Sequence, residues 1–112
     1  MVKFNFNYVG RKFEVEVEEC KTVLGKTMGL MFRKKSLPLL FYFNKLGRAP
    51  IHSFFCKPFF AIWFDGKKVV DGKLVKPWRL SVKPKEKFDK LLEVPSGSKD
   101  FLLLSTEESF KY

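Results

Sequence analysis

The sequence contains no Gln, a single His and only two Cys among its 112 residues. A zinc site requires a set of Cys, His or acidic ligands at short spacings, and this chain has no such spacing. We therefore expect no metal and no cofactor. Long apolar segments are also missing, because the uncharged stretches are far shorter than the roughly 20 residues that span a bilayer. The amino terminus lacks the apolar core of a signal peptide, so we expect a cytoplasmic protein without a membrane partner.

The two thiols, Cys20 and Cys56, are too few for a disulfide framework. Two interpretations stay open, either two small buried hydrophobic side chains or one pair. The absence of Gln, with only three Asn and with Lys and Glu supplying most of the charge, favours a thermophilic source.

Composition excludes several classes of protein. Apolar residues make up 46% and charged residues 30% of the chain, which is unlike a disordered, collagen-like or coiled-coil sequence. The length suits a single domain over residues 1–112. Lys and Arg total 22 against 12 Asp and Glu, a net charge of +10. An excess of that size favours anionic partners.

Apolar and polar residues alternate at the start of the chain with the period of a half-buried strand. The alternation covers Val2–Tyr8, pauses around Gly10 and resumes over Phe13–Val17. A Gly between two such segments predicts a β-hairpin. Its second strand should present the carboxylates of Glu14, Glu16 and Glu18 to water.

The remaining pattern predicts a small, mainly β (α+β) domain with a compact, barrel-like, antiparallel or mixed sheet and one short helix. The helix is expected at Thr22–Phe32, where the apolar period changes. Loops are expected at Asn44–Pro50 and Lys83–Lys90, and a polar tail at 105–112. Further strands are expected at Leu39–Phe43, Ile51–Cys56, Phe60–Phe64, Lys68–Val70 and Leu74–Val75, with an edge strand at Phe101–Leu104.

Four phrases resemble one known family in their order and spacing. They are Gly29-Leu30-Met31-Phe32-Arg33, His52-Ser53-Phe54-Phe55, Val75-Lys76-Pro77-Trp78-Arg79 and Leu92-Glu93-Val94-Pro95-Ser96-Gly97. Over residues 29–97 the chain resembles the prokaryotic "domain of unknown function 192" family, as a short archaeal-type member. The resemblance implies a compact, mostly β fold with a short helix, and it implies no particular reaction. Cys56 and Ala61 depart from the family pattern, which has Met and Asp there, so any role of that acid in relatives is lost here.

Eight residues are candidates for a functional site, and none is assigned a catalytic role. His52 is either structural or a general base that needs an orienting carboxylate. Glu93 is expected to face water, and pairing with Arg33 or Arg79 is the alternative. A binding surface is expected to combine Arg33, His52, Lys57, Lys76, Trp78 and Arg79, and a pocket to combine Met31, Arg33, His52 and Glu93.

The sequence is consistent with three functions. The first is a non-catalytic binding or accessory domain with a protein partner, because no acid, base, nucleophile and ligand set is assembled. The second is nucleic-acid binding through Gly66–Lys90, which holds nine Lys or Arg against three acids. The third is a small-molecule binder or enzyme that uses the pocket near Glu93.

Overall fold

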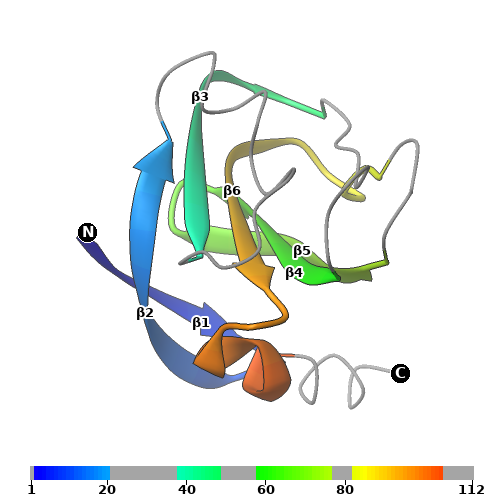
Figure 1. The fold of residues 1–112 in the computed structure, drawn as a ribbon. Coiled ribbons are helices and arrows are strands. Elements are labelled where there is room, and N and C mark those ends of the chain that lie inside the picture. Colours follow the sequence, from blue (N-terminus) through cyan, green and yellow to red (C-terminus); the bar gives the residue numbers. More distant parts are fainter. Residues whose placement is uncertain (1, 21–37, 49–57, 77–81, 105–112) are drawn as a thin grey trace.

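The computed structural model describes residues 2–20, 38–48, 58–76 and 82–104. Its strands form one six-stranded sheet in the order β1-β2-β3-β6-β4-β5, which curls into a half-barrel with β1 and β5 at its two edges (Figure 1). β2 pairs parallel with β3, and the other ladders are antiparallel. The predicted mainly β fold with a mixed sheet is confirmed. The strands are β1 (Val2–Tyr8), β2 (Arg11–Cys20), β3 (Leu39–Gly47), β4 (Phe59–Asp65), β5 (Lys68–Val75) and β6 (Phe88–Pro95).

The predicted amino-terminal hairpin is confirmed. β1 and β2 pair from Val2↔Val17 to Tyr8↔Arg11, and Val9 and Gly10 form the two-residue turn with φ of 50° and 73°. Two positive φ values give the turn the twist that a hairpin requires. Glu14, Glu16 and Glu18 are exposed as expected, and the apolar side chains between them are buried.

The two faces of the sheet carry separate apolar clusters. The first core lies where the β1–β2 hairpin wraps over β4 and β6, and it contains ring contacts such as Phe6 with Phe64 and Tyr8 with Phe60. The second core lies on the opposite side of β3, β4 and β6, and its buried aromatic side chains are Phe41, Phe59, Trp63 and Phe88. Alternation along β4 explains this arrangement, because Phe60, Ile62 and Phe64 face one core and Phe59, Ala61 and Trp63 face the other. β4 is therefore buried on both faces.

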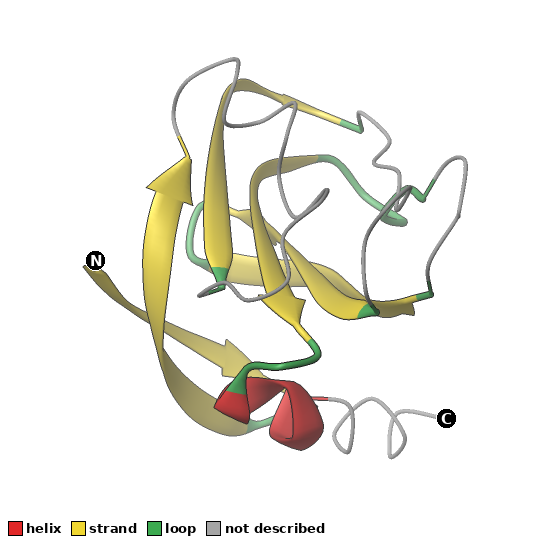
Figure 2. Ribbon diagram, viewed as in Figure 1, coloured by secondary structure: helices red, strands yellow, loops and turns green. Residues whose placement is uncertain are grey.

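The prediction of an edge strand at Phe101–Leu104 is wrong, because these residues lie in a helix whose described part covers 99–104 (Figure 2). Ser98 caps its start, since its Oγ accepts a hydrogen bond from the backbone N–H of Asp100 at 3.3 Å. The helix buries Leu104 in the first core and leaves Leu102 exposed. A four-residue apolar segment is compatible with a helix or a strand. The Ser98 cap favours the helix, because it satisfies a backbone N–H of the first turn.

Several strand boundaries also differ from the prediction. Lys68–Val70 and Leu74–Val75 belong to the single strand β5, because a register shift beside Trp63 and Phe64 lets the ladder continue through Asp71 and Gly72. β3 continues to Gly47 with a shift after Tyr42, so the expected loop begins later. The loop predicted at Lys83–Lys90 ends at Phe88, where β6 starts.

Four predictions lie outside the described residues. They are the helix at Thr22–Phe32, the strand at Ile51–Cys56, the polar tail at 105–112 and any pairing of Cys20 with Cys56. Within the described ranges, no helix is both long and apolar enough to cross a membrane.

Candidate functional site

Of the eight candidate residues, the structure describes Lys76 and Glu93 and does not bring them together. Lys76 is exposed just beyond β5 and lines a groove of about 260 Å³ with Lys73, Leu74, Val75 and Val82. Glu93 is buried on β6. The other six, Met31, Arg33, His52, Lys57, Trp78 and Arg79, lie outside the described residues.

Glu93 does not face water, which corrects the expectation from alternation. It sits between Leu39 of β3 and Ala61 of β4 in the ladder, on the side of the sheet that carries the second core, and only 6% of it is exposed. Burial raises the pKa of its carboxyl to about 8, because an apolar environment disfavours the charged form. Trp63 is buried on the same side, and its indole N–H has no hydrogen-bond acceptor among the described residues. The expected pairing of Glu93 with Arg33 or Arg79 lies outside the described residues.

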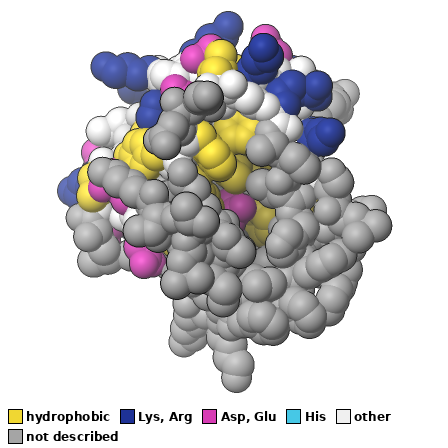
Figure 3. All heavy atoms as spheres, turned by 90° about the horizontal axis from the view of Figure 1, so that it is seen from above, with side chains coloured by type: hydrophobic (Ala, Val, Ile, Leu, Met, Phe, Trp, Pro, Cys, Tyr) yellow, Lys and Arg dark blue, Asp and Glu magenta, His cyan; other side chains and the backbone are white. Residues whose placement is uncertain are grey.

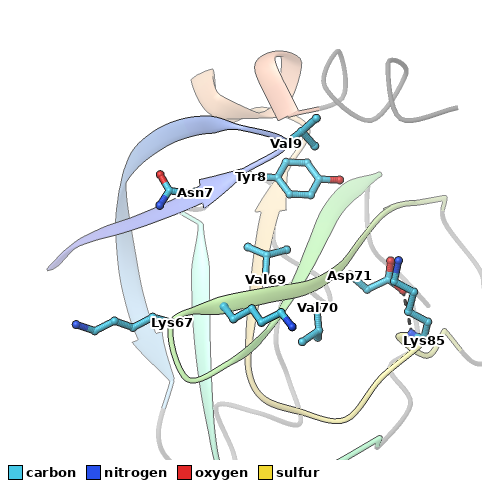
Figure 4. Close-up of a pocket in the computed structure, with 9 residues that line it drawn as sticks. Asn7, Tyr8, Val9, Lys67, Val69, Val70, Asp71 and Lys85 are labelled. Carbon is cyan, nitrogen blue, oxygen red and sulfur yellow. Dashed lines mark hydrogen bonds between the residues drawn. The ribbon is translucent and has the colours of Figure 1, made fainter.

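A larger groove, of about 410 Å³, lies between the two edge strands of the half-barrel (Figure 4). We call it the edge groove. The end of β1 and the hairpin turn form one wall, and the β4–β5 turn with the first half of β5 forms the other. Lys85 comes from the segment between β5 and β6. The lining residues are Asn7, Tyr8, Val9, Lys67, Lys68, Val69, Val70, Asp71 and Lys85.

Charge in the edge groove is strongly positive. Lys67, Lys68 and Lys85 are exposed, whereas the acidic lining residue, Asp71, is only 7% exposed. Both Asp71 oxygens are already engaged, since Oδ1 accepts the Gly72 N–H at 2.9 Å and Oδ2 accepts the Lys85 N–H at 3.0 Å. In Figure 3, most of the described Lys and Arg side chains lie along the upper margin of the view with some Asp and Glu among them, and hydrophobic side chains occupy the middle. The edge groove can therefore receive a negatively charged group.

The segment that carries Lys85 is held by two side chains of β5 and by Arg48. Asp71 of β5 binds the Lys85 amide, and the Lys73 ammonium donates to the carbonyl of Lys83. Arg48, just after β3, donates from Nε and Nη2 to the Pro84 carbonyl at 3.2 and 2.8 Å. A guanidinium that donates twice to one oxygen fixes the backbone there. Lys85 is thus positioned by its backbone, and its side chain is left exposed at the groove.

The two walls meet where Tyr8 packs over Gly72. A Cβ added to Gly72 would lie 2.5 Å from the Tyr8 hydroxyl and 2.9 Å from Cζ, so only a glycine permits this approach. Beside it, Val9 holds a left-handed φ of 50° although it is β-branched, and its side chain is 45% exposed. A positive φ costs a β-branched residue on the order of 1–3 kcal/mol, and the two-residue hairpin turn requires it at this position.

Sequence reasoning missed the edge groove because its walls come from three separated segments. The basic content of Gly66–Lys90 was visible, but the contribution of Asn7, Tyr8 and Val9 depends on how the sheet curls. The one local signal was Val9-Gly10, since Val is unusual at a position where the hairpin turn needs a positive φ.

Comparisons with known proteins identify proteins that are similar to this chain in structure and in sequence. Two solved structures share the fold, each at 17% sequence identity. One is a protein of unknown function from Novosphingobium aromaticivorans, with a TM-score of 0.73 over 93% of this chain and 75% of that one. The other is a protein from Sinorhizobium meliloti described as a candidate transcription regulator, with a TM-score of 0.70 over 83% and 78%. Identity this low supports the shared fold alone.

Closer relatives come from Pyrococcus. The chain is 33% identical to a UPF0127 protein of Pyrococcus furiosus, over 79% of this chain and 78% of the relative. It is 34% identical to that of Pyrococcus horikoshii, over 79% of each chain, and 30% identical to that of Pyrococcus abyssi, over 90% and 89%. The chain therefore belongs to the UPF0127 family, whose relatives found here are archaeal. No protein-family model matches the chain.

Proposed function

We propose that this protein is a non-catalytic binding domain and that the edge groove holds an anionic partner. The observation that carries the proposal is the charge of the groove. Three exposed lysines line it, and the two oxygens of its acidic lining residue, Asp71, are already bound by backbone amides.

Nucleic-acid binding through residues 66–90 is the second candidate. Lys67, Lys68, Lys76, Lys83, Lys85 and Lys87 of this segment are all exposed. Such lysines attract phosphates by releasing counterions, and the affinity falls steeply with salt. The transcription-related description of the Sinorhizobium protein agrees with this candidate, although the likeness to that protein concerns the fold.

The proposal is tested with two exposed lysines that lie two residues apart. Lys85 lines the edge groove, whereas Lys87 lies in the same basic segment outside it. Labelled single-stranded and duplex oligonucleotides and a labelled acidic peptide are titrated with the protein at low and high salt, and fluorescence anisotropy reports binding. We expect Lys85→Glu and Lys68→Glu to weaken binding roughly tenfold, about 1.4 kcal/mol, because each places a negative charge in the groove.

Lys87→Glu is the matched control and should change the affinity less than threefold. Equal losses in the Lys85→Glu and Lys87→Glu variants would mean generic attraction to a polycation and would contradict the groove as the site. The absence of binding at low salt would reject both candidates.

The remaining expectations stay proposals on sequence grounds. They are the single domain over 1–112, the cytoplasmic location, the thermophilic source and membership of the "domain of unknown function 192" family. The binding surface of Arg33, His52, Lys57, Lys76, Trp78 and Arg79 and the pocket of Met31, Arg33, His52 and Glu93 also stay predictions. The burial of Glu93 supports a small-molecule site at that pocket, because buried carboxyl groups are common in binding sites.

A further inference from the structure

The edge groove lies between two strands that each have one unpaired side in the sheet. β1 pairs only with β2, and β5 pairs only with β4, in the described sheet order. The walls touch through Tyr8 and Gly72, and the groove opens beside that contact, along Lys68–Val70. An unpaired strand side presents backbone N–H and C=O groups that can bind another extended chain.

Side chains along the groove alternate in character. Tyr8 and Val69 pack with the first core, whereas Asn7 and Lys68 are exposed. Val70, on the same face of β5 as Lys68, is buried in the second core. A strand added here would continue both surfaces, since successive side chains of a strand point to opposite faces. Its inward side chains would meet apolar neighbours, and its outward side chains would meet Lys68 and Lys85.

We propose that an extended partner peptide in which acidic and apolar residues alternate adds as a strand to the free side of β5 in the edge groove. This inference rests on the proposed function, because it specifies which anion the groove holds. Main-chain hydrogen bonds to β5 supply affinity, and the lysines select the acidic side chains.

The protein already contains one such pairing. On its other side, β1 pairs with β2, whose residues 13–18 read Phe-Glu-Val-Glu-Val-Glu, with Val15 and Val17 buried and the three carboxylates exposed. Lys3 Nζ lies 3.5 Å from a Glu14 carboxylate oxygen across that ladder. Strands of this composition therefore suit this sheet, with acids on the outer surface and apolar groups in the first core.

The test uses the full chain and a labelled synthetic hexapeptide, Phe-Glu-Val-Glu-Val-Glu. Two isomers carry backbone N-methyl groups, either on the odd or on the even residues. A strand that pairs on one side uses only alternate amides, so we expect one isomer to lose more than tenfold in affinity and the other to bind like the parent. A peptide with Lys in place of Glu is the charge control and should not bind.

The outcomes separate this inference from the proposed function. Equal binding of the parent and both isomers, weakened by Lys85→Glu, would keep the anionic groove and overturn strand addition. Binding of oligonucleotides without binding of the peptide would overturn strand addition in favour of a nucleic acid. No binding of either probe at low salt would overturn both proposals.

Discussion

The structure buries two acidic side chains to the same degree in very different surroundings. Asp71, on edge strand β5, is 7% exposed, and each of its oxygens accepts a backbone N–H. Glu93, on central strand β6, is 6% exposed between Leu39 and Ala61, and its carboxyl forms no hydrogen bond or ion pair with any of the described residues. Burial raises the pKa of the Glu93 carboxyl to about 8.

Asp71 has a positioning role, whereas no role in the edge groove is evident for Glu93. Asp71 fixes Lys85 beside the edge groove and so contributes to the arrangement of its charges. Glu93 lies in the middle of an apolar face, where a neutral carboxyl is favoured over a charged one. The two regions therefore respond differently to pH and to substitution.

The largest expected effect is the pH dependence that Glu93 creates. Its pKa rises from 4.5 to about 8 on folding, because burial disfavours the charge. The folded protein therefore keeps a proton that the unfolded chain releases, and the free energy of unfolding falls as pH rises from about 4.5 to about 8. The loss is on the order of 5 kcal/mol. Urea unfolding across this pH range measures it.

Glu93→Gln removes the titration and nearly preserves the shape. We expect this variant to unfold at the same urea concentration at the two ends of the range, and to be more stable than the native protein above pH 8. A native protein whose stability does not decrease between these pH values would contradict the neutral buried carboxyl.

Asp71→Ala should destabilise the protein by about 2–4 kcal/mol, because the buried Gly72 amide and the partly buried Lys85 amide both lose a charged acceptor. Asp71→Asn keeps one acceptor oxygen and should lose about half as much. Urea unfolding at neutral pH gives both values. The contrast with Glu93 is direct, since the isosteric Glu93→Gln change should cause no loss at the same pH. Equal losses at the two positions would show that the surroundings of the two acids do not matter.

A smaller effect is expected at the contact that joins the edges of the half-barrel. Gly72→Ala places a Cβ against the buried Tyr8 ring, and overpacking of this kind costs about 1–3 kcal/mol. Gly97→Ala is the matched control, because nothing lies within 4 Å of its added Cβ. Thermal unfolding should separate the two variants by several degrees. Identical midpoints would show that Tyr8 does not need the bare backbone of Gly72.

The sequence predicted the parts of the fold that depend on local alternation. The β1–β2 hairpin, its exposed carboxylates and the location of strand β4 all follow from residue periods within a few positions of each other. The helix that contains Leu104 was missed because its apolar residues are few, although Ser98 with Asp100 two residues later is a helix-start signal. Glu93 was misplaced because alternation assigns a face to a residue and cannot show that both faces of a sheet are covered.

The candidate site depended on distant contacts. The basic character of residues 66–90 is a property of composition, but a groove requires Asn7 and Val9 to lie opposite Lys68. That proximity comes from the curl of the whole sheet and from the Tyr8–Gly72 contact, which no local pattern encodes. The groove could not be predicted from the sequence, because it depends on how the curled sheet brings its two edge strands together.

The central claim is that the edge groove is the binding site of this protein. NMR amide shifts recorded while the Phe-Glu-Val-Glu-Val-Glu peptide is added test this claim most directly. We expect the amides of Asn7, Val9, Lys68 and Val69 to shift together with the Lys85 amide that Asp71 holds, while the Glu93 amide stays in place. Shifts centred on Glu93 and its ladder neighbours, with the groove amides unchanged, would contradict the account.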